Sequence, residues 1–159
     1  MRGCSPIFPP LGENSGIKTV PIHHEPMKLE FNSPFSAAFA VEDARLIFVS
    51  GRCTVPSYHK HPHDPIEERQ WLDNDFREQT ERTFAPMKLI LDAAGADFAN
   101  VVFLTVYLTD AGNQDVLNEI SARHFGSDNP PPRSVIRVVG LAHTDMMIEI
   151  DGIAAVPRS

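Results

Sequence analysis

One amphipathic segment, residues 75–95, limits the folds open to this chain, because its apolar side chains recur at helical spacing on one face. Asp75 can cap the helix, with Glu78 three residues later, and Gly95 supplies a stop signal. Pro86 lies inside the pattern and removes a backbone donor, so we expect a kink there. A helix of this kind needs a partner surface. Its apolar face consists of Phe76, Thr80, Phe84, Met87, Ile90, Leu91 and Ala94.

The remaining patterns predict a second helix and several strands. Val116, Leu117, Ile120 and Phe125 form another apolar stripe, which ends just before Gly126. Alternating or β-branched runs indicate the strands, because such side chains suit a pleated, half-buried surface. Strands are expected at residues 28–31, 38–41, 46–51, 101–108, 134–139 and 146–156.

The element order β-β-β-α-β-α-β-β favours an α+β sandwich, with one mostly antiparallel sheet and two helices on one of its faces. No element remains to cover the opposite face, so its apolar residues predict self-association. Residues 1–27 carry five prolines without a sustained period, and we interpret them as an irregular arm before a single domain of residues 28–159. The stretch between Thr54 and Trp71, rich in His, Pro and charge, is typical of a loop.

Composition disfavours several classes of function. Fourteen Lys and Arg against twenty-one Asp and Glu give a net charge of −7, which repels nucleic acid. The longest largely apolar run, residues 101–108, is far shorter than the ~20 residues of a membrane helix. Cys4 and Cys53 form neither a disulfide framework nor a zinc set, and Cys53 is expected to be a small buried hydrophobe. No secretory or transit pattern opens the chain, so we expect a cytoplasmic protein.

Two charged residues on predicted strands are candidates for chemistry. Arg133 follows three prolines, and a guanidinium held there can offer a planar fork to a carboxylate. Strand alternation places Glu149 and Asp151 on one side of another strand, where a glutamate can position or deprotonate a water. The structural alternative is a cross-strand ion pair between Arg133 and Glu149. Neither residue is diagnostic by itself.

Three polar or flexible positions are weaker candidates. Ser50 and Gly51 end a predicted strand, where a hydroxyl and a permissive backbone can approach a ligand, although an ordinary turn is the commoner meaning. Asn118 lies within the second helix, where a solvated or locally bonded side chain is the commoner role. These residues therefore indicate a functional site only in combination with other motifs.

In combination, the motifs resemble the RidA (YjgF) family. They occur in the family's order, and the resemblance covers roughly residues 28–156, most of the chain. The motifs are Pro34-Phe35-Ser36, Leu46-Ile47-Phe48-Val49-Ser50-Gly51, Glu78-Gln79-Thr80, Leu91-Asp92-Ala93-Ala94-Gly95, Asn118 before Phe125-Gly126, Pro132-Arg133-Ser134 and Ile148-Glu149-Ile150-Asp151-Gly152-Ile153-Ala154.

The resemblance implies a chorismate-mutase-like fold assembled as a homotrimer, with three clefts between subunits. It also implies hydrolysis of reactive enamines and imines derived from amino acids, which releases ammonia and a 2-keto acid without a metal or organic cofactor. The partners expected are therefore a small-molecule substrate and two further copies of the chain. By position, Arg133 would bind the substrate carboxylate and Glu149 would engage the attacking water. The residues expected to line or support the cleft are Ser50, Gly51, Phe35, Asn118 and Val135.

The sequence departs from the family pattern at three places. Phe35 stands where deaminating members often have tyrosine, so a hydroxyl able to touch the substrate is missing. Val135 replaces a frequent cysteine, and the loop before Ile148 is one residue longer than usual. These differences fit a bulkier or less polar substrate, such as an aminomuconate-like ring-cleavage compound or a biosynthetic intermediate.

Other functions stay open. A non-catalytic module could use Arg133 to bind small carboxylates at the same cleft. Ribonuclease activity, a label that the family often carries, is disfavoured by the negative charge. His59, His61 and His63 alternate and can share a metal if the segment is extended, but a solvated loop is expected, since Pro62 and Pro65 mark irregular chain.

Overall fold

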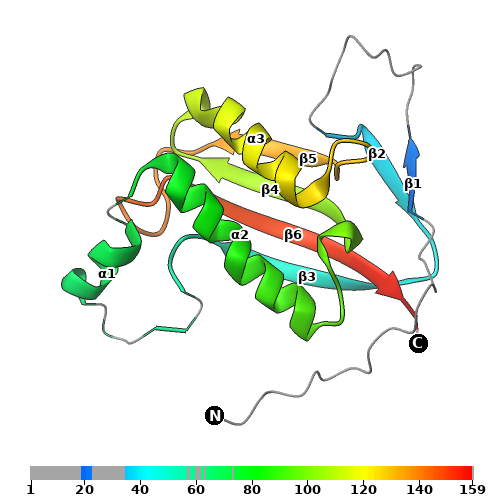
Figure 1. Ribbon diagram of the computed structural model, residues 1–159, viewed down its shortest axis with the longest axis horizontal. Coiled ribbons are helices and arrows are strands. Elements are labelled where there is room, and N and C mark those ends of the chain that lie inside the picture. Colours follow the sequence, from blue (N-terminus) through cyan, green and yellow to red (C-terminus); the bar gives the residue numbers. More distant parts are fainter. Residues whose placement is uncertain are drawn as a thin grey trace.

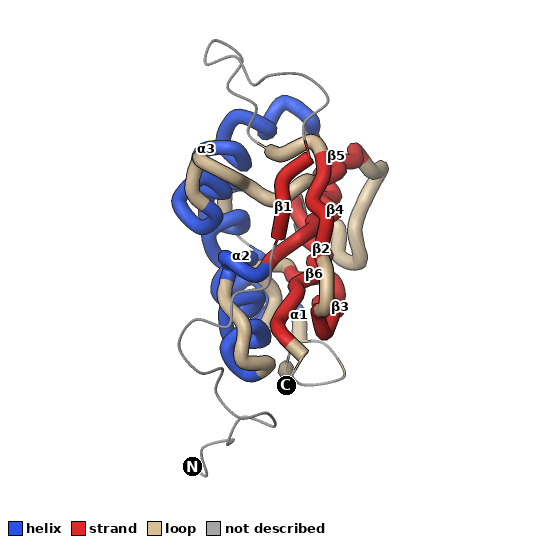
Figure 2. Tube along the Cα trace, turned by 90° about the vertical axis from the view of Figure 1, so that its right-hand side faces the viewer, coloured by secondary structure: helices blue, strands red, loops and turns tan. Residues whose placement is uncertain are grey.

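Helices α2 and α3 cover one face of a four-stranded sheet (Figure 1), and the side view separates the helical layer from the strands (Figure 2). The computed structural model describes residues 19–22, 35–56, 58–59, 62, 64–72 and 74–158. The elements are β1 (Thr19–Ile22), β2 (Ala38–Val41), β3 (Ala44–Arg52), α1 (Pro65–Leu72), α2 (Phe76–Ala93), η1 (Phe98–Asn100), β4 (Val101–Leu108), η2 (Ala111–Asn113), α3 (Gln114–Phe125), β5 (Arg133–Arg137) and β6 (Ile148–Pro157).

The sheet has the strand order β3-β6-β4-β5, in which β6 is antiparallel to β3 and β4 while β5 is parallel to β4. The α+β class is confirmed, and β4 has the predicted bounds. Because β4 separates β5 from β6, the alternative of a cross-strand ion pair between Arg133 and Glu149 is wrong. Sequential order suggested that the last two strands were neighbours, whereas the pairing is decided by contacts across the sheet.

Helix α2 begins and ends at the predicted residues. The Asp75 side chain accepts a hydrogen bond of 2.9 Å from the Glu78 N–H, and Gly95 has a φ of 70°, which glycine adopts without strain. The helix is unbroken across Pro86, so a kink at that residue stays a prediction. Its apolar face packs on the sheet and α3, where the fully buried side chains include Phe84, Met87, Leu91, Leu117 and Ile120.

A third helix, α1, occupies part of the stretch that was expected to be a loop. Pro65 stands at its first position, where a missing N–H breaks no helical hydrogen bond, and the Asp64 side chain accepts from the Ile66 N–H at 2.8 Å. The loop prediction for residues 54–71 is therefore wrong over residues 65–71. It treated Pro65 as a loop marker although the same residue also favours a helix start. None of the helices in the described residues is long and apolar enough to cross a membrane.

A separate two-stranded sheet precedes the main one. Strand β1 pairs antiparallel with β2, Thr19 opposite Val41, and both lie outside the four-stranded sheet. The predictions of a single sheet and of an irregular arm therefore need correction, since residues 19–22 form a strand. Pro21 disfavoured a strand at these residues in the sequence, although an edge strand tolerates proline. The strand predicted at 28–31 lies outside the described residues.

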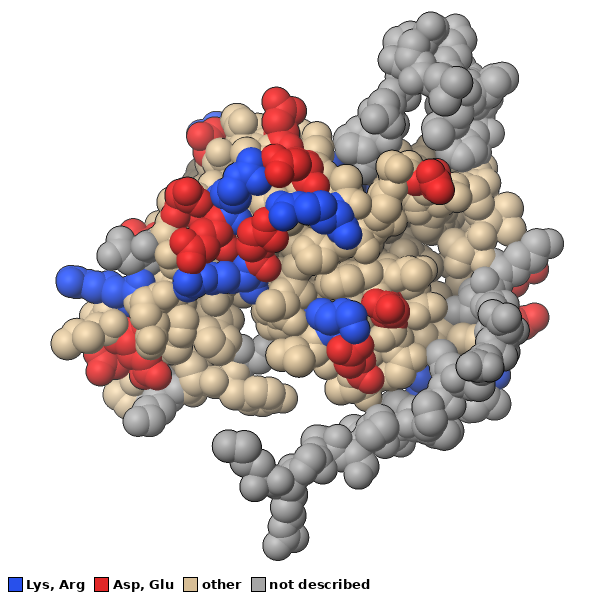
Figure 3. Space-filling view, in the orientation of Figure 1, with Lys and Arg blue, Asp and Glu red and all other residues tan. Residues whose placement is uncertain are grey.

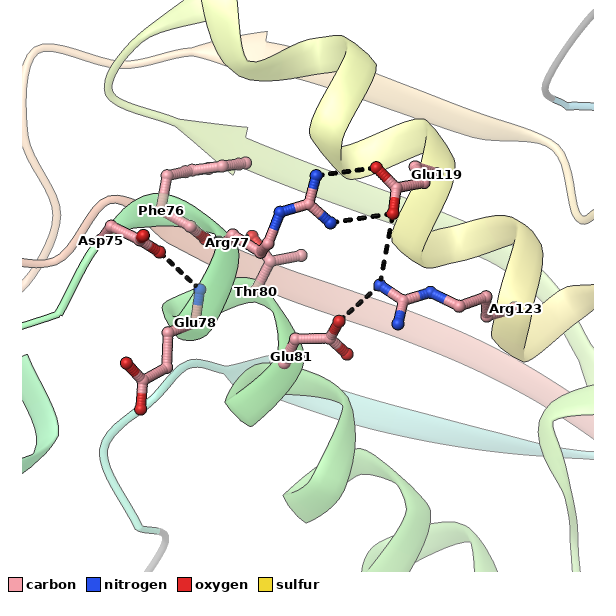
Figure 4. A network of polar contacts seen from close by, with 8 residues as sticks. All are labelled: Asp75, Phe76, Arg77, Glu78, Thr80, Glu81, Glu119 and Arg123. Carbon is pink, nitrogen blue, oxygen red and sulfur yellow. Dashed lines mark hydrogen bonds and ion pairs between the residues drawn. The ribbon is translucent and has the colours of Figure 1, made fainter.

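The solvent face of α2 and α3 carries interleaved charges of both signs (Figure 3). The Arg77 guanidinium donates two hydrogen bonds to Glu119, at 2.8 and 2.7 Å, and Arg123 donates to Glu81 (Figure 4). Because these side chains are largely exposed, water and salt screen the pairs, and we attribute little stability to them. They align the two helices rather than build a site.

The other face of the four-stranded sheet carries exposed apolar side chains. Phe48 is 73% exposed, Leu46 is 48% exposed and Ile136 is 42% exposed. No helix of the described chain covers this face (Figure 2), which we call the open face. Contiguous apolar surface of this kind is typical of an interaction surface.

Candidate active site

Arg133 begins β5 and reaches from the sheet toward α3. Its Nη1 donates to the Ser121 hydroxyl at 3.3 Å, and its Nη2 donates to the Asn118 side-chain oxygen. The guanidinium carbon lies 5.7 Å from the centre of the Phe35 ring. A hydrogen bond of 3.1 Å from the Ser36 N–H to the Pro130 carbonyl holds this ring near residues 130–132, the three prolines before β5, which we call the proline connector. Three predicted residues, Arg133, Asn118 and Phe35, are thus brought together.

The Arg133 guanidinium retains donors for a further partner. Its Nε atom is buried and has no acceptor among the described residues, and burial lowers the pKa of the group. Arginine has five N–H donors, of which Asn118 and Ser121 take only two. A buried donor without a partner is costly in a folded protein, and it is common where a ligand supplies the acceptor. The arrangement suits an anion.

A cavity of about 260 Å³ lies beside Arg133, between α3, β4 and the proline connector. Its wall is mixed, with polar groups next to the guanidinium and apolar side chains around them. Such a cavity fits a small molecule with one charged end and an apolar remainder. Its lining residues are Leu104, Asn118, Ser121, Ala122, Phe125, Gly126, Ser127, Pro130, Pro131 and Arg133.

Two residues near Arg133 differ from expectation. Val135 lies on the same strand face as Arg133, but it packs against the core and does not line this cavity. Ser121 was missed, although it hydrogen-bonds Arg133 and lines the cavity. The signal was its spacing, since residues three apart on a helix, here Asn118 and Ser121, project on the same side.

Glu149 lies on the open face, above the end of β3. A Cβ atom placed on Gly51 would lie 1.9 Å from the Glu149 Oε1 atom, so only glycine allows this close approach. Burial raises the pKa of Glu149, the nearby Asp151 charge raises it further, and Arg52 lowers it. Arg52 also donates to the Ser50 hydroxyl at 2.8 Å. Ser50, Gly51 and Glu149 therefore form a second group, which we call the Glu149 cluster.

A tyrosine that the sequence analysis missed lies next to this cluster. The Tyr107 hydroxyl donates to the Asp151 Oδ2 atom at 3.0 Å, and Tyr107 is directly opposite Glu149 in the pairing of β4 with β6. The bond to Asp151 raises the pKa of the tyrosine. The sequence feature that could have pointed to Tyr107 is a hydroxylated aromatic residue within a largely apolar strand.

Within one chain, Arg133 and the Glu149 cluster lie on opposite faces of the sheet. Leu104 is opposite both Arg133 and Gly152, and a Cβ on Gly152 would contact Met87 of α2, so these residues face the helices. Glu149 is three residues from Gly152 along β6 and therefore points to the other face. The expectation that Glu149 lies near Arg133 does not hold within one chain. Residues an odd number of positions apart on a strand point to opposite faces of the sheet, and Glu149 is three positions from Gly152, which faces the helices.

The other histidines and cysteines considered in the sequence lie partly outside the described residues. His61 and His63 lie outside the described residues, while His59 Nδ1 is 2.8 Å from the Pro56 carbonyl. Within the described ranges, no group of three His, Cys, Asp or Glu residues could hold a metal ion. Burial raises the pKa of the half-buried Cys53 thiol, which favours its neutral form. Cys4 lies outside the described residues.

Comparison with known proteins connects these groups to a family. The chain matches the family described as Endoribonuclease L-PSP over residues 27–156. It is 34% identical over 121 residues to human 2-iminobutanoate/2-iminopropanoate deaminase, covering 76% of this chain and 79% of that one. Protein DfrA of Myxococcus xanthus is also 34% identical over 121 residues, which cover 76% of this chain and 84% of that relative.

The solved structures agree with the sequence relatives. A protein of unknown function from Yersinia pestis, YyfB of the Rid protein family, superposes with a TM-score of 0.69 at 26% identity. The match covers 87% of this chain and 98% of that chain. The arrangement of strands and helices described above is therefore shared with a protein of the Rid family.

Proposed function

The chain belongs to the RidA (YjgF, L-PSP) family, and from that premise we propose that it hydrolyses imines and enamines derived from amino acids to keto compounds and ammonia. The human relative carries the name of a deaminase of 2-iminobutanoate and 2-iminopropanoate. Both of these compounds combine a carboxylate with an imine. The observation that carries the proposal is the buried Nε of Arg133, which has no acceptor in the described part of the chain and lies beside a small cavity.

Arg133 binds the substrate carboxylate in this proposal. Its free Nε–H and a second N–H of the guanidinium can donate two parallel hydrogen bonds to a carboxylate. Asn118 and Ser121 hold the guanidinium from the other side, so its orientation is set before the substrate arrives. The substrate side chain lies against the apolar part of the cavity, which includes Leu104 and Phe125.

Glu149 engages the attacking water. An imine carbon is already electrophilic, so hydrolysis needs an oriented water and a group that moves protons. Glu149 accepts a proton as the water oxygen bonds to the imine carbon, and it returns the proton to the nitrogen. Glu149 next takes the proton of the new hydroxyl group and passes it to the nitrogen, so the carbon–nitrogen bond breaks, ammonia leaves and the keto group forms. An enamine first takes a proton on carbon and enters the same sequence as an imine.

The site forms between two copies of the chain. Since Arg133 and Glu149 face opposite sides of one sheet, a single substrate meets both only if they come from neighbouring subunits. We propose the homotrimer that the family resemblance implies, with the open face buried between subunits. The exposed Phe48 and Leu46 support this assignment, because an apolar surface favours association.

The substrate class is proposed from the departure at Phe35, because Val135 packs against the core and does not line the cavity. Phe35 offers its ring without a hydroxyl. Together with the apolar part of the cavity, this ring favours a less polar substrate than the small imino acids of the human relative. An aminomuconate-type compound or a biosynthetic intermediate is compatible with this description.

Ammonia release from freshly generated imines tests the proposed function. Amino acids with side chains of increasing size are oxidised in place by an amino-acid oxidase, and the decay of each imine is followed with and without the protein. We expect faster decay for apolar side chains than for polar ones. Binding of the keto acid without any acceleration would instead favour the non-catalytic carboxylate-binding module.

A further inference from the structure

Three polar side chains lie on the open face, across β4 and β6. The Tyr107 hydroxyl donates to Asp151 at 3.0 Å, and Asp151 is two residues from Glu149 on the same face of β6. Asp151 also lines a hollow of about 520 Å³ together with Ser50 and Gly51 of the Glu149 cluster. Asp151 therefore lies at the edge of a hollow, with a hydrogen-bond donor on one side and a second carboxylate on the same strand face.

Tyr107 differs from its neighbours on β4 in the face of the sheet to which its side chain points. Val106 and Leu108, its neighbours in the chain, are almost fully buried on the helix side, so the core accounts for their apolar character. Tyr107 points the other way, where packing requires no hydroxyl. Its oxygen instead finds Asp151, 44 residues later in the chain.

We propose that Tyr107 is a positioning residue for the reaction: its hydroxyl holds the Asp151 side chain in place beside Glu149. The two carboxylates then act as a coupled acid–base pair, in which Glu149 exchanges the proton with water and substrate nitrogen. This inference rests on the proposed function, because it assigns the proton chemistry of that same site. Tyr107 itself does not touch the substrate.

The charges around Glu149 support this role. The groups that face it are Asp151 on its own strand, Tyr107 on β4, and Arg52 and Cys53 at the end of β3. Burial and the Asp151 charge raise the pKa of Glu149, and Arg52 opposes them. A carboxylate whose pKa is raised toward the working pH is a stronger base toward water, and a pKa near that pH suits an exchange in which the proton is first taken and then returned. Fixing the Asp151 charge keeps this effect constant.

The hydrogen bond itself is tested without any activity measurement. The chain contains two tyrosines, so Tyr58→Phe leaves Tyr107 as the single phenol for an ultraviolet pH titration. Adding Asp151→Asn removes the negative acceptor, and we expect the pKa of Tyr107 to fall by about one unit. An unchanged titration would show that the two groups do not interact, which overturns the proposal.

The positioning role is tested by pH–rate profiles of kcat/KM. Asp151→Asn removes the like charge next to Glu149, so the acid limb shifts downward by about one pH unit. Tyr107→Phe releases the Asp151 carboxylate from its position, so less of its charge acts on Glu149 and the acid limb shifts downward by a smaller amount. Tyr58→Phe, at a position 98% exposed, is the matched control and leaves the profile unchanged.

The outcomes separate this inference from the proposed function. Turnover in the unaltered protein with no downward shift of the acid limb in Tyr107→Phe overturns the positioning role alone. No turnover with any imine overturns the proposed function and the role of Tyr107 in it, even if the tyrosine titration reports the bond. A loss of fold is recognised separately by circular dichroism of each variant.

Discussion

Individual donors and acceptors carry most of the argument for a ligand site. Arg133 is tied to Asn118 and Ser121 and still has a buried Nε–H to offer. Glu149 is pressed against Gly51 and has a raised pKa because of burial and the neighbouring Asp151. The first group suits an anion and the second suits proton transfer. Substitutions that change one property at a time can separate the two.

Arg133→Lys keeps the positive charge but replaces the planar fork with a compact ammonium group. We expect kcat/KM to fall by about tenfold or more, because a lysine cannot donate two parallel hydrogen bonds to one carboxylate. Steady-state kinetics with the best imine substrate measure the change. Arg137→Lys, at an exposed position of the same strand, is the control, and equal kinetics for both variants would contradict the carboxylate-binding role.

Glu149→Gln keeps the shape of the side chain and removes its basicity. We expect kcat to fall by about 100-fold with little change in KM or melting temperature. Glu42→Gln, on the exposed turn before β3, serves as the control. A lower melting temperature with an unchanged rate per folded molecule would assign Glu149 a structural role instead.

At the scale of elements, the buried Gln79 of α2 and the half-buried His124 of α3 join segments that are distant in sequence. The Gln79 side chain donates to the carbonyls of Leu72 and Asp145 and accepts from the Met147 N–H at 3.0 Å. It connects α2 to the end of α1 and to the loop before β6. His124 stacks on the Phe84 ring at 4.4 Å and joins α3 to α2.

Gln79→Leu preserves the bulk of a fully buried side chain but leaves three backbone groups without their partner. We expect the free energy of unfolding to fall by about 2 kcal/mol or more, since each buried unpaired group is costly. Denaturant titration measures the loss. Gln70→Leu on α1 is the exposed control and should change stability by less than about 0.5 kcal/mol. Equal losses in both variants would argue against the buried connection.

His124 predicts how stability depends on pH. Its pKa is lowered mainly by burial, so below its ordinary value near 6.5 the unfolded chain takes up a proton that the folded chain resists. The contribution of His124 is therefore complete above pH ~6.5 and decreases as the pH falls below it. Denaturation at several pH values should show this acid slope, and His124→Phe should reduce it. The same slope in both proteins would exclude His124 as its source.

At the scale of the whole molecule, the sheet separates two half-sites that the proposed trimer joins. Its helix face holds Arg133, and its open face holds Glu149 beside exposed apolar residues. The family description includes ribonuclease activity. However, acidic and basic side chains are interleaved on the solvent-exposed surface of the helices (Figure 3), and the chain carries a net charge of −7. This distribution favours a small substrate over a polyanion.

Mixing two inactive variants tests whether the site is shared between subunits. Arg133→Ala and Glu149→Gln chains are co-expressed in equal amounts, so that random trimers contain both. If each site takes Arg133 from one subunit and Glu149 from its neighbour, about one quarter of the sites are intact and activity returns to that level. Either variant alone stays inactive. No recovery in mixed trimers, or a monomer by mass measurement, would contradict the shared site.

Local signals in the chain predict helices α2 and α3, the bounds of β4 and residues around Arg133. Side-chain periodicity, the Asp75 cap and the glycine after each of these two helices act over a few residues, and these predictions agree with the structure. The family motifs also indicate Asn118 and Phe35 as neighbours of Arg133. Local signals fail at Pro65, because a proline is compatible both with a loop and with the first position of a helix.

The tertiary structure decides which strands are neighbours and therefore which side chains meet. Insertion of β4 between β5 and β6 separates Arg133 from Glu149, and it also brings Tyr107 to Asp151. Periodicity assigns a side chain to one of two faces but does not relate the faces of different strands. That relation depends on hydrogen-bond register between segments tens of residues apart, which forms only when the whole sheet packs against α2 and α3.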